Sequence, residues 1–440
     1  MNRSDHLPAR PRFFYGWVIV AIAFVTMAVA ISARTGFSLL FPALIDEFGW
    51  SRGVTAGAFS IGFVASTAFV PLVGLLMDRF GPRVVIPLGG VLVGAGYLVA
   101  PFISTPIGLY ASVGLLITCG SMATSYIVHS MFLPNWFVRR RGLAVGLAFS
   151  GVGVGGIVLF PMMQWLIAGE GWRTACVAMG VVVIAIVVPL NALLQRARPQ
   201  DMGLEPDGDM AVGAGSDRTP SPDPVVDREW TSRTWTLATA MRTARFWWVF
   251  GGYFCGLFVW YAIQVHQTRF LLEAGFEPGI AAAALGLVGL FGIAGQIGIG
   301  ALSDRVGREI AWTCSLLGYA ASSALLLVLA DAPSVPAMYL MVITQGLLGY
   351  GLSALFGAIP AEIFAGPRFA SIFGILSLGG NLGAGAGPWV LGILYDVTGT
   401  YAPGFWICLA FSFVSIGCIW MAAPRKVRLV AGRARSKAAM

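Results

Sequence analysis

Residues 74–83, GLLMDRFGPR, have a close counterpart at 300–309, GALSDRVGRE. Both stretches fit the pattern G-x-x-x-D-R-x-G, and their acidic residues, Asp78 and Asp304, are 226 positions apart. A second correspondence, at an offset of 227, pairs Arg141 with Arg368, Gly156 with Gly383, and Pro161 with Pro388. Two independent matches at nearly one offset indicate that the chain consists of two related halves.

The composition is that of an integral membrane protein. Of 440 residues, 57% are hydrophobic and 11% are charged, and the mean hydropathy is +0.80, which is too apolar for an ordinary water-facing surface. Charge-free runs long enough for a helix of about 20 residues lie between Arg12 and Arg34, Arg52 and Asp78, Arg141 and Glu170, Arg173 and Arg196, Arg245 and Arg269, Glu277 and Asp304, Glu309 and Asp331, Asp331 and Glu362, Arg368 and Asp396, and Asp396 and Arg425.

The 55 residues between Arg83 and Arg139 fit two further spans that turn at PFISTP, 101–106. We therefore predict an all-α fold of twelve transmembrane helices, arranged as two pseudo-symmetric bundles of six. Residues 196–245, with five prolines, eight acidic and seven basic residues, predict a flexible linker. The predicted domains are an N-terminal bundle (1–195), this linker (196–245), and a C-terminal bundle with a short tail (246–440).

The basic residues predict the orientation in the membrane. If both termini are cytoplasmic, the cytoplasmic segments hold 24 of the 28 Lys and Arg residues, as the positive-inside rule requires. This distribution also accounts for the basic pI without a nucleic-acid partner. Arg outnumbers Lys 26 to 2, which hints at a GC-rich bacterial genome, so we expect a multi-pass protein of a bacterial inner membrane.

The repeated phrase sits between the second and third spans of each half, where it resembles the loop signature of the major facilitator superfamily. Its glycines allow a tight turn and close helix contact, and its Asp can face a helix N-terminus, where the dipole favours an anion. The resemblance implies that the motif holds the halves together on the cytoplasmic side in the outward-open state; the alternative is a charged turn that merely obeys the positive-inside rule. The implied gating residues are Gly74, Asp78, Arg79, Gly81, Arg83, Gly300, Asp304, Arg305, Gly307 and Arg308.

Further stretches resemble the bacterial monocarboxylate porter and oxalate/formate antiporter group: FFYGW at 13–17, FGWSR at 48–52, LPNWFVRRRGLA at 133–144 and RPQDMGLEPDG at 198–208. The resemblance implies that a basic residue in the outer half of the first span binds a substrate carboxylate, and Arg34 lies at a similar place. Those porters commonly have an Asp and Arg pair in span eight, and the oxalate antiporters have basic residues in spans eight and eleven. Neither span is charged here, which counts against a dicarboxylate substrate.

Ionisable residues within spans usually line a cavity or pair with a partner, because lipid exposure costs about 2.5–3.5 kcal/mol. Arg34 lies eight residues before Pro42, about 12 Å below the outer edge, and a guanidinium matches a carboxylate with two hydrogen bonds. The alternative for Arg34 is snorkelling or pairing with a backbone carbonyl. The predicted substrate-binding residues are Arg34, His266, Gln264, Tyr126, Asn381 and Arg269, and the proton-coupling candidates are His266 and His129.

Several of these residues could instead have a purely structural role: Arg269 lies near a span end, where arginines anchor to the interface, and isolated polar residues often form interhelical hydrogen bonds. The predicted function is secondary transport of a small organic anion, in particular a monocarboxylate, by alternating access. Coupling could use the substrate's own ionisation, a histidine, or anion exchange; we favour proton symport. The alternatives are a drug or neutral-solute exporter and a transport-inactive receptor. We expect a monomer without metal or cofactor and no enzymatic activity, since no phosphate-binding loop or catalytic set is present.

Overall fold

The computed structural model describes residues 14–50, 52–208 and 225–438. The first thirteen residues and 209–224, at the centre of the predicted linker, lie outside the described residues. Within the described ranges, the only β-structure is an isolated bridge between Val225 and Arg428. Eleven described segments are long and apolar enough to cross a membrane, and the 29-residue helix α2 (Arg52–Phe80) completes the twelve expected spans.

The N-terminal bundle contains three single-helix spans, a broken fourth span, a fifth span in two pieces and a single-helix sixth span. They are α1 (Gly16–Phe48), α2, α3 (Pro82–Val99), the fourth span from α4 (Pro106–Leu109), η2 (Tyr110–Ile117), α5 (Thr118–Ala123) and α6 (Tyr126–Trp136), the fifth from α7 (Arg141–Phe149) and α8 (Gly151–Glu170), and α9 (Trp172–Leu194).

The C-terminal bundle repeats this order, with its tenth span broken. It consists of α12 (Ala244–Glu273), α13 (Pro278–Val306), α14 (Arg308–Asp331), the tenth span from α15 (Val335–Ile343), η5 (Thr344–Leu348), η6 (Gly349–Gly351), α16 (Leu352–Phe356) and α17 (Ala358–Ile363), then α18 (Phe369–Thr398) and α19 (Ala402–Ala422). The short helix α20 (Ala431–Ala438) follows.

The broken spans are the fourth of each bundle, and each contains a π-helical turn, η2 in one and η5 in the other. A π-turn inserts an extra residue into the helical repeat, and such turns are frequent at functional sites. Tyr126 begins the helix after the first break, and Tyr350 lies in the 3₁₀ turn directly after the second π-turn. The breaks therefore occur in equivalent spans and place a tyrosine near each.

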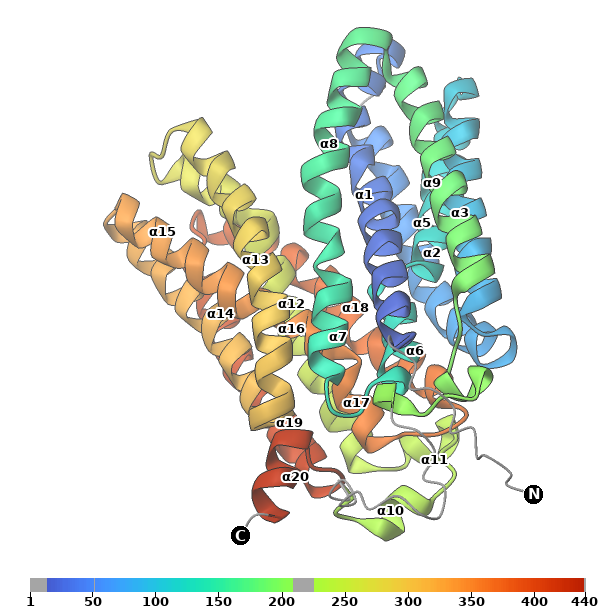
Figure 1. Cartoon of the computed structure of the whole chain (residues 1–440). Helices are drawn as coiled ribbons and strands as arrows, with labels where there is room; N and C mark the ends of the chain where they lie inside the picture. Colours follow the sequence, from blue (N-terminus) through green and yellow to red (C-terminus); the bar gives the residue numbers. More distant parts are fainter. Residues whose placement is uncertain (1–13, 51, 209–224, 439–440) are drawn as a thin grey trace, which may run out of the picture.

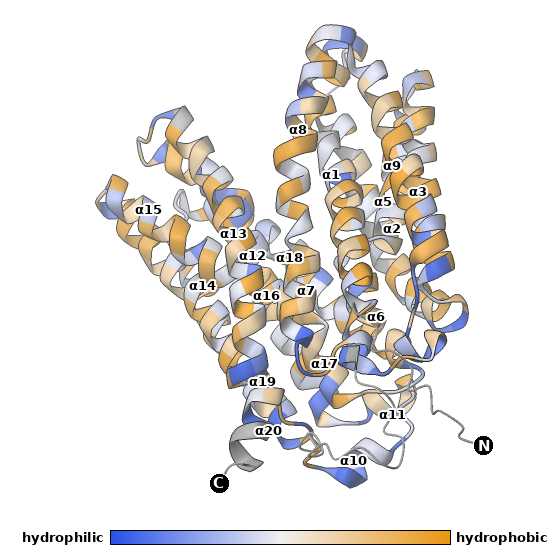
Figure 2. Ribbon diagram, in the orientation of Figure 1, coloured by the Kyte–Doolittle hydropathy of each residue, from blue (hydrophilic) through white to orange (hydrophobic). Residues whose placement is uncertain are grey.

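The two bundles meet at one end and diverge at the other (Figure 1). We call the end that includes α6, α7, α17 and the start of α18 the closed end, and the opposite end the open end. Hydrophobic residues predominate along the spans, and hydrophilic residues gather toward the helix ends and around α10 (Arg228–Ser232) (Figure 2).

Glycines let the backbones of the two bundles touch at the closed end. A Cβ atom added to Gly300 on α13 would lie 2.2 Å from the carbonyl oxygen of Gly142 on α7, and one added to Gly74 on α2 would lie 2.9 Å from that of Ala370 on α18. Such close approach is possible only for small residues. The interface between the bundles is therefore built largely from two helix pairs, α7 with α13 and α2 with α18.

The described parts of the predicted linker pack against the bundles. The carboxylate of Asp207 accepts hydrogen bonds from the backbone N–H groups of Val138 and Arg139, at 3.0 and 2.9 Å. The indole N–H of Trp230 donates to the carbonyl of Ile363 at 2.8 Å. The expectation of a flexible linker did not include these contacts, because the charge and proline content of the segment gives no sign of them.

Candidate functional site

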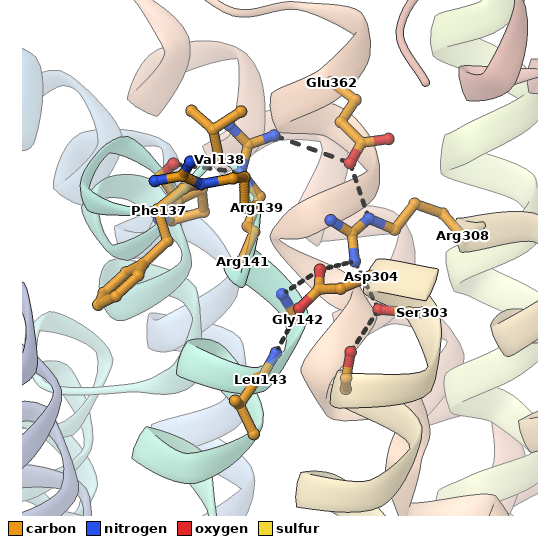
Figure 3. Close-up of polar contacts among 12 residues, drawn as sticks. Phe137, Val138, Arg139, Arg141, Gly142, Leu143, Ser303, Asp304, Arg308 and Glu362 are labelled. Atoms are coloured by element: carbon orange, nitrogen blue, oxygen red, sulfur yellow. Dashed lines mark hydrogen bonds and ion pairs between the residues drawn. The ribbon is translucent and has the colours of Figure 1, made fainter. Parts of the chain in front are cut away.

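The acidic residue of the second motif lies at the N-terminus of α7. One oxygen of Asp304 accepts the N–H of Gly142 at 2.9 Å, and the other accepts that of Leu143 at 3.0 Å (Figure 3). These are the second and third residues of α7, whose N–H groups have no partner within the helix, and the helix dipole adds a favourable field. Because Asp304 belongs to α13, this contact joins the two bundles.

The first motif makes the same kind of contact with the bundles exchanged: its acid lies in the N-terminal bundle and the helix N-terminus in the C-terminal bundle. Asp78 on α2 accepts the N–H groups of Ala370 and Ser371, at 3.2 and 2.9 Å, the second and third residues of α18. The hydroxyl of Ser371 also donates to Asp78. We call the two Asp-to-helix contacts the Asp304 latch and the Asp78 latch. Each bundle thus contributes one acid and one helix N-terminus to the closed end.

A buried group of charges surrounds the Asp304 latch (Figure 3). The Arg308 side chain is 1% exposed, and it donates to Asp304 and to Glu362, each at 2.7 Å. Glu362 also lies 3.8 Å from the guanidinium of Arg141, which belongs to the other bundle. The charges of the two carboxylates, Asp304 and Glu362, balance those of the two guanidinium groups, Arg308 and Arg141, as burial of charge requires. Glu362 was not predicted, because its only signal in the sequence is an acidic residue at the end of an apolar run.

The other predicted gating residues have separate partners. Arg83 donates to the carbonyl of Ala192 at 2.7 Å, within the N-terminal bundle, and Arg79 lies over the ring of Phe80. Gly81 and Gly307 have φ angles of +71° and +111°, a left-handed range that favours glycine. These glycines form the turns into α3 and α14, and the arginines other than Arg308 lie outside the latches.

Arg34 on α1 lies near Tyr261 on α12, which belongs to the other bundle. The Arg34 side chain is partly buried. Tyr261 is 38% exposed, so part of this residue lies at the surface of the helix bundle. The neighbourhood of this cation therefore includes residues of both bundles.

Further polar groups lie close to this pair. Tyr126 on α6 lies near Gln296 on α13 and near Tyr261 and Tyr350 of the same bundle as Gln296. Gln264 on α12 donates to the hydroxyl of Tyr350 at 3.1 Å and accepts from the indole of Trp260 at 2.9 Å. We call the set the central cluster; it consists of Arg34, Tyr126, Tyr261, Gln264, Gln296 and Tyr350.

The remaining predicted residues lie elsewhere. His266 contacts the carbonyl of Pro388 and the hydroxyl of Tyr401, at 2.9 and 3.4 Å, so its described partners belong to the C-terminal bundle. Arg269, whose side chain is 69% exposed, pairs with Glu273 at 2.7 Å. His129 is fully buried and contacts the carbonyl of Ser125 at 2.9 Å. Asn381 lies on α18, partly buried.

The structure thus brings together Arg34, Tyr126 and Gln264 of the predicted residues and adds two tyrosines. Tyr261 and Tyr350 were not predicted, because tyrosine is common in apolar helices and only the fold shows which face each one presents. A usable signal for Tyr350 was its position between two glycines, in GYG at 349–351, a composition that weakens a helix.

Residues 18–354 and 284–438 match the family model described as Major Facilitator Superfamily. The chain belongs to this superfamily. Monocarboxylate transporter 13 of Bos taurus is 27% identical, with 92% of this chain and 88% of that protein covered. Monocarboxylate transporter 11 of Homo sapiens is 29% identical, covering 92% and 83%. The crystal structure of the E. coli fucose:proton symporter has a TM-score of 0.67 at 16% identity, covering 93% of this chain and 100% of that one.

Membership of the Major Facilitator Superfamily agrees with the architecture predicted from the repeat. The chain is a multi-pass membrane protein of twelve spans in two six-helix bundles. The solved symporter shares this fold over nearly the whole length of both chains.

Proposed function

We propose that the chain is a secondary active transporter that moves a small organic anion, in particular a monocarboxylate, by alternating access. The observation that supports this most strongly is that Arg34 on α1 and Tyr261 on α12 lie near each other although they belong to different bundles. A substrate bound there contacts both halves, as alternating access around a central site requires. The similarity to proteins named as monocarboxylate transporters supports the choice of substrate.

The chemistry of the central cluster suits a carboxylate with a polar body. The guanidinium of Arg34 offers two parallel donors, and the hydroxyl of Tyr261 offers a third. Gln264 and Gln296 supply amide groups from the C-terminal bundle. Because the cluster has one cation, an anion with a single charge is matched best.

We further propose that the closed end is cytoplasmic, in a bacterial inner membrane, with both termini on that side. The arginines of both motifs, Arg139–Arg141 and Arg368 belong to the closed end, and basic residues are retained on the cytoplasmic side. On this assignment the structure corresponds to an outward-open state, and the transporter acts as a monomer.

Uptake into proteoliposomes tests the assignment of Arg34. We expect Arg34→Ala to reduce the uptake of labelled lactate or pyruvate at least tenfold, and Arg34→Lys to retain part of it, because an ammonium keeps the charge but not the planar pair of donors. The matched control is Arg242→Ala, which removes an exposed arginine at the closed end. Normal uptake by Arg34→Ala would contradict the proposal, and preferential uptake of neutral solutes would favour an exporter of uncharged compounds.

Proton coupling is proposed to use His266. Its Nε2–H donates to the carbonyl of Pro388, so neutral His266 accepts the Tyr401 hydroxyl at Nδ1. Protonation makes both ring nitrogens donors, which reverses the contact between α12 and the residue that precedes α19. A proton on His266 thus changes the contact between α12 and the start of α19, while the bond to Pro388 on α18 is kept.

For His266→Gln we expect uptake that an inward proton gradient no longer stimulates, whereas exchange of labelled for unlabelled substrate continues. His129→Gln tests the second histidine under the same conditions. If the gradient still stimulates His266→Gln as strongly as the wild type, the proton is bound elsewhere or enters with the substrate.

A further inference from the structure

A pocket of about 590 Å³ lies at the closed end, away from the central cluster. Four parts of the chain line it: the start of α1, the loop before α7, the end of α13 and the tail helix α20. Asp207 of the linker completes it. Since α7 and α13 belong to different bundles, the pocket exists in this form only while the closed end is assembled.

The pocket has a surplus of positive charge. Arg139, Arg140 and Arg305 line it together with Asp207 and Asp304. Both carboxylates already have partners: Asp304 accepts two N–H groups of α7 and is paired with Arg308. The Asp207 carboxylate accepts two N–H groups and lies 3.6 Å from the Arg139 guanidinium.

Two arginines of the pocket extend to the surface. Arg140 and Arg305 line the pocket from opposite bundles, Arg140 from the loop before α7 and Arg305 from the last turn of α13. Because Asp207 and Asp304 already have partners, an anion in the pocket would be bordered by arginines from both bundles. Arginine suits a phosphate group in particular, because its planar donors match two phosphate oxygens.

Aromatic side chains form another wall of the same pocket. Phe14 and Trp17, at the start of the first span, and Phe137 line it, and the ring of Phe137 lies 4.9 Å from that of Trp17 and 5.5 Å from that of Phe14. Tryptophan at a span end is typical of the level of the lipid headgroups. The pocket therefore combines cationic and apolar groups at the depth where a phospholipid has its phosphate and the start of its acyl chains.

We propose that this pocket binds a phosphate-bearing anion, supplied by the headgroup of an anionic phospholipid or by a soluble phosphate ester, and that occupancy stabilises the state with the closed end assembled. Basic pockets between transmembrane helices at the cytoplasmic side bind lipid headgroups in this way. A ligand held by both bundles favours the conformation in which they meet. The site is separate from Arg34 and does not depend on the identity of the transported substrate.

The test measures the melting temperature of the purified full chain in detergent with three additions: phosphatidylglycerol, phosphatidylcholine or millimolar glycerol 3-phosphate. We expect phosphatidylglycerol, but not phosphatidylcholine, to raise the melting temperature of the wild type by several degrees. The shift should fall by at least half in Arg140→Gln/Arg305→Gln and persist in the matched control Arg242→Gln/Lys426→Gln, which removes two cations of the same end that do not line the pocket. Arg140→Gln alone should lose part of the shift and guards against misfolding of the double variant.

The three additions also distinguish the sources of the phosphate. An equal shift with glycerol 3-phosphate, lost in the same variants, supports the site and identifies a soluble ligand; a shift with phosphatidylglycerol alone supports the site and identifies a lipid. The proposal is overturned if neither addition acts, if phosphatidylcholine acts equally, or if the shift survives in Arg140→Gln/Arg305→Gln.

A second measurement addresses the conformational claim. Spin labels at Glu170 and Asp331, both exposed at the open end, are introduced into a chain without its native cysteines and reconstituted in nanodiscs with the ligand identified above. A long distance between the two labels reports molecules whose open end is open. The ligand should increase the fraction of such molecules at least twofold in the wild type but not in Arg140→Gln/Arg305→Gln. An unchanged population in the wild type would overturn the stabilising effect.

Discussion

Glu362 and Arg34 are charges within apolar surroundings that the fold treats in different ways. Glu362, 5% exposed, lies between Arg308 and Arg141 and is neutralised from both bundles. Arg34 lies near Tyr261 of the other bundle, and the carboxylate of the substrate is proposed to bind there. A buried charge with a fixed ionic partner stabilises one conformation, whereas a charge that binds a mobile anion couples conformation to binding. We therefore assign Glu362 a structural role, because its partners are fixed arginines, and Arg34 a functional role, because its proposed partner is the transported anion.

Replacement of Glu362 should reveal the cost of the uncompensated arginines. Glu362→Gln leaves Arg308, 1% exposed, with Asp304 as its described acidic partner and removes the ion pair of Arg141. Loss of one member of a buried ion pair costs about 3–5 kcal/mol, so we expect a large fall in melting temperature and yield. Glu170→Gln, an exposed acid at the end of α8, is the control, and equal melting temperatures for the two variants would contradict this account.

At the scale of elements, the spans could be predicted from sequence, and their internal breaks could not. Lipid excludes charge, so charge-free runs fix the number of spans, and the repeated motif fixes the turns before α3 and α14. The π-turns η2 and η5 lie within charge-free runs, and the spacing of the charges carries no trace of them. Residues whose position depends on those breaks, such as Tyr350, consequently escaped prediction, whereas Arg34 could be proposed as a candidate because its charge alone singles it out.

Two glycines on α13 provide a matched test of helix contact. A Cβ atom at Gly300 would lie 2.2 Å from the carbonyl oxygen of Gly142, whereas one at Gly298 has no atom within 4 Å. Both sites are helical, so alanine brings the same gain of about 1 kcal/mol in helix propensity. We expect Gly298→Ala to be neutral or stabilising and Gly300→Ala to push α7 from α13, opening the closed end. Cysteine accessibility at the closed end measures this, and equal labelling of both variants would refute it.

At the scale of the molecule, a symmetric sequence has produced an asymmetric closed end. Arg141 and Arg368 correspond in the repeat, but Arg141 is buried and paired with Glu362, while Arg368 is exposed. The position equivalent to Glu362 at the offset of 227 is Asn135, a neutral residue that donates to the carbonyl of Ala197. The Asp304 latch is therefore embedded in a buried ionic group, and the Asp78 latch is supported by the Ser371 hydroxyl alone among the described contacts.

This asymmetry predicts that the two latches hold the closed end unequally. In Asp78→Asn the amide retains one acceptor for the N-terminus of α18, and the loss resembles that of a helix cap, about 1 kcal/mol. Asp304→Asn loses the same helix-cap contact and also breaks the ion pair with Arg308. Because this ion pair is buried, its loss costs more free energy. Spin labels at Glu170 and Asp331 report the separation of the bundles at the open end. The fraction of molecules with the short distance between these labels should therefore rise slightly in Asp78→Asn and strongly in Asp304→Asn. Equal shifts would mean that the helix N-termini, rather than the surrounding charges, set the conformational equilibrium.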